Sequence, residues 1–242
     1  MWEPKHDQFL FSTKFDSSLI ELIPTKRVVL SIIVRIFDPL GLISPVVVLG
    51  KLLIQDIWAE GLDWDEPLRE YLQQRWIEFR TSLCHLAKLS ISRSVCRSTP
   101  VRIEQHGFAD ASQRAYGACV YLRSIYSDGT ITMHLLCSKS RNASKPNITI
   151  PRLELCAAQL LARLILKTTE ALKIDFNDVV LKKNPNQLEI FVRNRVTEIV
   201  TKTNHLSWKY VNSKDNPADI VSRGRSAGDL LNDDLCGMGQ FS

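Results

Sequence analysis

The chain has 242 residues, of which 45% are hydrophobic and 24% are charged. This composition excludes a disordered tail, a collagen-like repeat and a small protein held together by disulfide bonds. The 31 basic and 26 acidic residues give a net charge of +5, which permits a nucleic-acid partner without requiring one.

The first 90 residues are predicted to be mostly helical. Thr25 can cap a helix that starts at Lys26, and Asp38-Pro39-Leu40-Gly41 ends that helix, because proline disfavours the helical conformation in the residue before it. The apolar stretch 28–54 is interrupted by charged residues and prolines, so we expect a protein core and not a membrane span. The elements expected here are a strand over residues 8–15 and helices over residues 26–37, 45–59 and 67–87.

The pattern changes after a basic, serine-rich connector at residues 92–100, so a domain boundary is expected near residue 90. Three strands, a helix, and then alternating strands and helices are typical of an α/β sheet domain, here of about 130 residues. Ser127-Asp128-Gly129 is a hairpin signal. The chain after Arg225 is predicted to be frayed. The elements expected here are strands over residues 101–110, 116–123, 130–138, 176–181 and 207–211 and helices over residues 151–172, 187–201 and 217–222.

The cysteines and the N-terminus bear on the compartment. Six cysteines occur without a Cys-x-x-Cys pair, and Cys119, Cys137 and Cys156 lie in apolar runs, which predicts buried free thiols. The N-terminus lacks the basic start and apolar core of a signal peptide. We therefore expect an intracellular protein, cytoplasmic or nuclear, that is neither secreted nor membrane-spanning.

Three acidic residues stand out by their positions. Asp110 ends a predicted strand in GFADAS, and Glu154 and Asp219 lie in the first turns of predicted helices. Carboxylates are typical ligands of Mg²⁺, and three or four of them can hold two ions about 3.5–4 Å apart, as in nucleases that cut phosphodiesters. Alternatively, Glu154 and Asp219 only stabilise the dipoles of their helices.

Basic residues gather near the C-terminal end. Between residues 182 and 225 there are nine basic and four acidic residues. Such a cluster is typical of phosphate contacts that do not read sequence, although a solvated helix face gives the same pattern. The residues predicted to contact nucleic acid are Lys182, Lys183, Arg193, Arg195, Lys209, Lys214, Arg223 and Arg225.

The chain resembles the RNase H region of Bel/Pao-type LTR retrotransposon Pol polyproteins in three motifs: FADAS, IPRLELCAAQLLARL and W-x-x-V-x-S-K-D-N-P-A-D-x-x-S-R-G. The block from Pro24 to Trp58 is similar to the segment that follows the reverse-transcriptase palm in these elements. The resemblance implies an α/β fold, an RNase H-like mixed five-stranded sheet with flanking helices. The implied regions are a helical thumb/connection-like region at 1–90, the RNase H-like domain at 100–226 and a tail at 227–242.

The resemblance also implies a site and a reaction. Asp110, Glu154 and Asp219 correspond to the first, second and last catalytic carboxylates of the family, which hold two Mg²⁺ or Mn²⁺ ions. The implied partner is an RNA–DNA hybrid, whose RNA strand is cut, and the implied context is a larger Pol polyprotein.

One catalytic motif of the family is missing. The third catalytic aspartate normally follows the fourth strand, but here FNDVVL runs directly into KKNPNQLEIFVRNRV. Asp175 and Asp178 are the nearest acids that could substitute for it. We therefore expect impaired cleavage. The alternatives are an inactive nucleic-acid-binding relic and a non-functional Pol fragment. The chain has no polymerase palm, protease or integrase motif.

Overall fold

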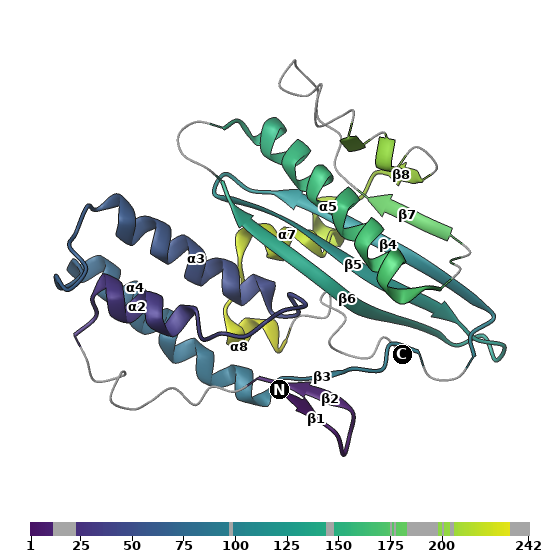
Figure 1. Ribbon diagram of the computed structural model, residues 1–242, viewed down its shortest axis with the longest axis horizontal. Helices are drawn as coiled ribbons and strands as arrows, with labels where there is room; N and C mark the ends of the chain where they lie inside the picture. The colour runs from purple at the N-terminus through teal and green to yellow at the C-terminus, as the bar shows by residue number, and fades with distance from the viewer. Residues whose placement is uncertain are drawn as a thin grey trace.

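The computed structural model describes most of the chain and gives its main elements (Figure 1). The described residues are 1–11, 23–96, 99–143, 148–174, 176, 178–182, 198–199, 201–203 and 206–232.

Within residues 23–96, the helices agree with the sequence prediction in number and order. They are α2 (Lys26–Ile33), α3 (Ser44–Ala59) and α4 (Glu70–Ser82), which continues into the 3-10 helix η1 (Leu83–Lys88). Thr25 caps α2 as predicted, because its hydroxyl accepts from the Val28 N–H at 3.3 Å. The prediction that α2 extends to Phe37 was wrong: Val34 and Phe37 are exposed, so neither side chain adds a buried contact that would stabilise a further turn.

A small sheet joins the N-terminus to the end of the helical region. Its strands are β1 (Trp2–Glu3), β2 (Gln8–Leu10) and β3 (Ser90–Ser92), all antiparallel. The sequence predicted only β2, and the rest of that predicted strand, from residue 12, lies outside the described residues. A two-residue strand is too short to give a period-2 pattern, which is why β1 was missed.

The larger sheet is mixed and five-stranded, with the order β6-β5-β4-β7-β8. The strands β4, β5 and β6 are antiparallel neighbours, whereas β7 pairs parallel with β4, and β8 pairs parallel with β7. This confirms the predicted α/β class. The strand bounds are β4 (Arg102–Ala111), β5 (Ala115–Ile125), β6 (Ile131–Asn142), β7 (Asp178–Lys182) and β8 (Ser207–Lys209).

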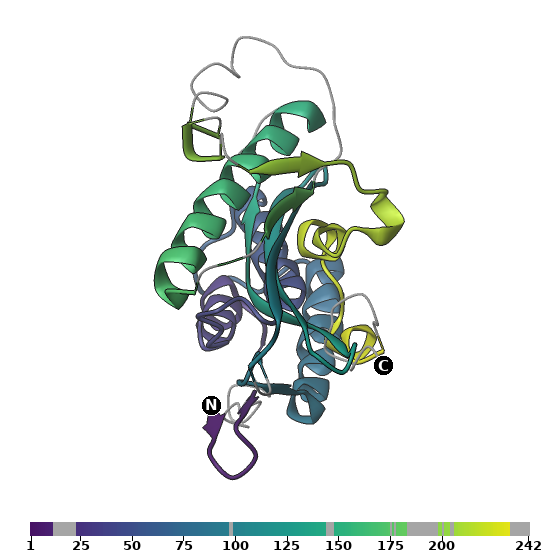
Figure 2. The ribbon, with the colours of Figure 1, turned by 90° about the vertical axis from the view of Figure 1, so that its right-hand side faces the viewer.

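Helices cover both faces of this sheet. The long helix α5 (Ile150–Leu172) packs Leu153, Ala157 and Leu161 on one face, and α7 (Ala218–Arg223) lies on the other (Figure 2). Most of the buried apolar side chains of α2, α3 and α4 join the core on the α7 side, which also contains Phe108 and Tyr121. One core therefore crosses residue 90, and the division into two domains near that residue stays a prediction.

The start of α3 is attached to the edge strand β6. The Ser138 N–H donates to the Leu40 carbonyl at 2.9 Å, and the Lys51 ammonium donates to the Ser140 carbonyl at 3.1 Å. The Asn142 amide donates to the Lys51 carbonyl at 3.0 Å. These bonds cover a sheet edge that would otherwise expose unpaired backbone groups, and they set the position of α3 beside the sheet.

The predicted frayed tail is wrong for its first residues. Residues Ala227–Leu230 form α8, in which Leu230 is 1% exposed within the same core as α4. Ser226 caps this helix by accepting from the Asp229 N–H at 3.1 Å. The Ser-x-x-Asp pattern was the available signal. The rest of the predicted tail, residues 233–242, and most of the predicted helix 187–201 lie outside the described residues.

The described cysteines are free, as predicted. Cys119, Cys137 and Cys156 are buried, and burial raises the pKa of Cys137 to about 12. Within the described residues, no helix is both long and apolar enough to span a bilayer.

Candidate active site

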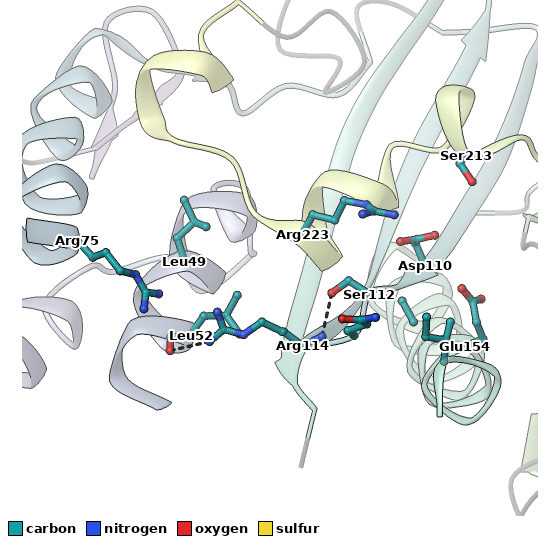
Figure 3. A pocket seen from close by; sticks show the side chains of 12 residues that line it. Leu49, Leu52, Arg75, Asp110, Ser112, Arg114, Glu154, Ser213 and Arg223 are labelled. Carbon is teal, nitrogen blue, oxygen red and sulfur yellow. Dashed lines mark hydrogen bonds between the residues drawn. The ribbon is translucent and has the colours of Figure 1, made fainter. Parts of the chain in front are cut away.

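A pocket of about 600 Å³ opens where the end of β4 meets the start of α5 and the side of α3 (Figure 3). Asp110 and Glu154 lie at one end of it, with Arg223 beside Asp110, and Arg75 and Arg114 lie toward the other end. The lining residues are Leu49, Leu52, Arg75, Asp110, Ala111, Ser112, Gln113, Arg114, Ile150, Glu154, Ser213 and Arg223.

Asp110 is the penultimate residue of β4 and is 6% exposed. Its carboxylate accepts from the Ser222 hydroxyl of α7 at 2.6 Å. Gly117 pairs with Asp110 across β5, and a Cβ there would lie 2.5 Å from a methyl carbon of Val221, so the glycine allows the close approach of α7. Burial raises the pKa of Asp110 above its ordinary value, and the charge of Asp219 adds to the increase, whereas the Ser222 hydrogen bond opposes it.

Glu154 lines the same pocket from α5 and is 5% exposed. The helix begins at Ile150, so Glu154 is its fifth residue, and the first turn of α5 contains no acidic residue. The prediction that Glu154 lies in the first turn was therefore off by about one residue, and its burial beside Asp110 is not explained by capping of the helix.

Asp219 lies in the first turn of α7, as predicted, but it does not line the pocket. Its carboxylate accepts from the Arg223 guanidinium at 2.7 Å. Figure 3 shows the Arg223 side chain extending toward Asp110. Arg223 therefore binds Asp219 and also places a positive charge near Asp110. Of the three predicted carboxylates, Asp110 and Glu154 line the pocket and Asp219 does not.

A two-ion site needs more oxygen ligands than the described acids supply. Within the described part of the chain, no three His, Cys, Asp or Glu side chains gather as a group that could hold a metal ion. Mg²⁺ is held octahedrally through six oxygen ligands, of which one or two are carboxylates and the others are waters or substrate phosphates, so two ions need several carboxylates close together. The described arrangement of Asp110, Glu154 and Asp219 does not fit a two-ion site, and their role as metal ligands stays a prediction.

The structure does not bring Asp178 to the pocket. Asp178 pairs with Glu104 at the opposite end of β4 and forms an ion pair with Arg102. Asp110 lies six residues further along β4, which at about 3.3 Å per residue is roughly 20 Å away. Asp175 lies outside the described residues.

Of the eight basic residues predicted to contact nucleic acid, Arg223 lines the pocket. Lys214 belongs to the 3-10 helix η3 (Ser213–Asp215), whose Ser213 also lines it. Lys209 ends β8, and the Arg225 N–H donates to the Pro45 carbonyl at 3.0 Å. The backbone of Lys182 ends β7. Outside the described residues lie Lys183, Arg193 and Arg195.

Sequence reasoning missed a cluster at the other end of the pocket. It consists of Asp56 on α3, Arg75 on α4 and Arg114 in the turn between β4 and β5. These residues come from three distant segments, so their spacing carried no signal. Only Arg114, four residues after Asp110, lies close in sequence to a predicted site residue.

Comparisons with known proteins agree with these observations on the fold family. The sequence profile described as the Pao retrotransposon-like RNase H-like domain matches residues 25–184. That range includes α2, α3 and α4 together with the strands β4 to β7 and α5. A comparison with curated proteins found no match.

Solved structures similar to the chain include two RNases H1 and one viral protease-reverse transcriptase. RNase H1 of the archaeon Halobacterium salinarum is 12% identical, with 55% of this chain and 99% of that chain covered and a TM-score of 0.33. LC11-RNase H1, solved with an RNA/DNA hybrid, is 13% identical, and the match covers 54% of this chain and 99% of that chain with a TM-score of 0.35. The prototype foamy virus protease-reverse transcriptase is 14% identical, with 81% and 33% covered and a TM-score of 0.32. Because the profile matches more than half of its length, this chain belongs to the Pao retrotransposon-like RNase H-like domain family.

Proposed function

We propose that this chain binds RNA–DNA hybrids at the pocket and that its cleavage of the RNA strand is strongly impaired. The observation that carries the proposal is that Asp110 and Glu154 line one open pocket, whereas the last predicted carboxylate, Asp219, lies outside it and is paired with Arg223. In such nucleases, carboxylates hold divalent ions that activate water and stabilise the leaving oxygen.

The chain that follows β7 supports the loss of cleavage. In the family, this position supplies a further carboxylate, but here the sequence after Leu181 is Lys-Lys-Asn-Pro-Asn, and no acidic residue follows before Glu189. Ligand number and charge set the affinity of a site for Mg²⁺ or Mn²⁺, so a missing carboxylate weakens ion binding. A basic residue in the pocket, Arg223, remains suited to the phosphates of a hybrid.

The wider context is part of the same proposal. We infer that residues 1–90 correspond to a thumb/connection-like region and residues 100–226 to the RNase H-like domain of a larger Pol polyprotein. An intracellular location, cytoplasmic or nuclear, follows from such an origin.

The first test is a cleavage and binding assay with a labelled RNA–DNA hybrid. Purified protein in excess over the hybrid is incubated with Mg²⁺ or Mn²⁺, and binding is measured separately in EDTA by fluorescence anisotropy. We expect the wild type to bind the hybrid but to cut it no faster than Asp110→Asn, because the ion site is incomplete.

A matched control separates the pocket from the surface. Asp65→Asn removes a carboxylate whose side chain is 71% exposed and paired with Arg27, outside the pocket, and it should bind as the wild type does. Metal-dependent cutting that is present in the wild type and Asp65→Asn but lost in Asp110→Asn contradicts impaired cleavage. Failure of the folded wild type to bind contradicts the proposed partner.

A further inference from the structure

Asp56 holds two arginines side by side in the wall of the pocket. The Arg114 Nη2 atom lies 2.6 and 2.7 Å from the two carboxylate oxygens of Asp56. The Arg75 Nη2 atom lies 2.8 Å from the second of these oxygens. A single carboxylate thus orients two guanidinium groups that come from α4 and from the turn between β4 and β5.

This cluster remains positively charged and open to solvent. One carboxylate cannot neutralise two guanidinium groups, and the Arg114 and Arg75 side chains are 47% and 39% exposed, against 21% for Asp56. Burial opposes ionisation of Asp56, but hydrogen bonds from Arg114 and Arg75 outweigh it and hold the pKa of this carboxyl below its ordinary value. Asp56 therefore stays ionised and keeps its partners in place at neutral pH.

The cluster shares its pocket with the two candidate catalytic carboxylates. Figure 3 shows Arg75 and Arg114 at one end and Asp110 and Glu154 at the other, with the apolar side chains of Leu49 and Leu52 near the arginines. A nucleic-acid backbone that lies along this pocket would therefore pass both the positively charged arginines and the acidic pair of Asp110 and Glu154. No acidic side chain other than those already named lines the described pocket, so the arginine end is suited to an anion.

Guanidinium chemistry favours an anion with two or more acceptor oxygens, such as a phosphate. Each arginine has five N–H donors in a planar fork that matches the oxygens of a phosphate. The contacts with Asp56 are made through Nη2, and each arginine also carries N–H groups on Nε and Nη1. Because Asp56 already restrains the long side chains, less conformational entropy is lost when a phosphate binds.

We propose that Arg75 and Arg114 bind a backbone phosphate of the RNA–DNA hybrid at the end of the pocket opposite Asp110 and Glu154. This inference rests on the proposed function and names a substrate contact for it. The helices before residue 90 thereby contribute directly to the substrate site, with Arg75 from α4 and the positioning residue Asp56 from α3. The phosphate contact does not require cleavage, so it is testable whether or not the chain cuts the hybrid.

The test measures hybrid binding in EDTA at several salt concentrations. Arg75→Gln and Arg114→Gln are each expected to weaken binding about tenfold. Because both arginines bind the same phosphate, the slope of log affinity against log salt should fall by about 0.7–0.9 in total in the double variant, the contribution of one phosphate contact. Arg75→Lys keeps the charge, so it should keep the wild-type salt slope while it loses part of the affinity.

Controls make the result specific to the pocket. Arg27→Gln removes an exposed arginine that is likewise paired with an aspartate, Asp65, and it should leave affinity and slope unchanged. The thermal midpoint of each variant is recorded, and binding is compared only at temperatures where the variant is folded. Equal losses in Arg27→Gln and the pocket variants, or an unchanged salt slope in the Arg75→Gln/Arg114→Gln double variant, would overturn the proposal. If the wild type binds the hybrid with the expected slopes but does not cut it, the phosphate site stands and only catalysis has failed.

Discussion

Replacing Gly41 by alanine is expected to lower the free energy of unfolding by about 2–5 kcal/mol. Gly41 has a φ of +73°, a conformation that costs an L-residue about 1–2 kcal/mol. A Cβ at this position would lie 1.9 Å from the backbone carbonyl oxygen of Ser138. Backbone cannot rotate away as a side chain can, so the clash adds an overpacking cost of about 1–3 kcal/mol.

A second glycine provides the matched control. Gly61 has a φ of +70°, but a Cβ added there would have no atom within 4 Å, so Gly61→Ala should cost only the conformational contribution of about 1–2 kcal/mol. Urea denaturation of both variants measures the difference between their free energies of unfolding. In thermal denaturation, we expect the midpoint of Gly41→Ala to lie roughly 10 °C below that of the wild type. Equal losses for the two variants would show that contact with Ser138 does not constrain this turn.

The turn at Gly41 also affects the pocket, because it determines where α3 lies. The turn at Gly41 precedes α3 and lies against β6, and α3 carries Leu49 and Leu52 in the pocket wall and Asp56 beside the arginines. A displaced turn would shift all three relative to Asp110. The contact between Gly41 and Ser138 is therefore a link between the packing of the helical region and the geometry of the proposed substrate site.

Elements with strong local signals were predictable from the sequence. Thr25 marks the start of α2, and the hairpin signal at Ser127-Asp128-Gly129 is confirmed by a turn in which Gly129 has a φ of +81° and the Asp128 carboxylate accepts from the Thr130 N–H at 2.8 Å. These features depend on residues a few positions apart. The strand β3 is short, so its stability comes from pairing with β2, a distant segment that no local pattern reports. Helix α8 has a local capping signal at Ser226, but its burial depends on the core that it shares with α4.

The candidate site was predictable only in part, because some of its contacts join residues that are distant in the sequence. The motifs predicted that Asp110 and Glu154 come together, and both line one pocket. They did not predict that Arg223, four residues after Asp219, would hold that carboxylate. The cluster of Asp56, Arg75 and Arg114 depends on how α3 and α4 pack beside the sheet. This packing is tertiary structure, which local sequence patterns do not predict.

A second charged network crosses the sheet far from the pocket. The Glu104 carboxylate on β4 accepts from Arg102 at 2.8 Å and from Arg123 of β5 at 2.8 Å, and it lies 3.0 Å from the His106 ring. Arg102 also pairs with Asp178 of β7. The network therefore connects three neighbouring strands, and Glu104 is its common acceptor, with a side chain that is 11% exposed.

Burial opposes ionisation of Glu104, but hydrogen bonds from His106, Arg123 and Arg102 outweigh it and lower the pKa to about 2. The ordinary value of 4.5 applies to the unfolded chain. The ionised carboxylate therefore stabilises the fold fully above pH 4.5, and this contribution is lost as the pH falls through about 2. Acid should weaken the connection among β5, β4 and β7 over this range.

Glu104→Gln is expected to lower the free energy of unfolding by about 2–3 kcal/mol at pH 7, because hydrogen bonds from charged donors lose their charged acceptor. The loss should shrink between pH 4.5 and 2, where the wild-type carboxylate itself becomes protonated. Urea denaturation at a series of pH values, with Asp65→Asn as the exposed counterpart, measures this. Asp65 is 71% exposed, so its replacement should have a much smaller effect. A Glu104→Gln loss that is the same at pH 7 and pH 2.5 would mean that the side chain acts through packing. Packing does not change with the protonation of Glu104, whereas the stabilisation by its charge does.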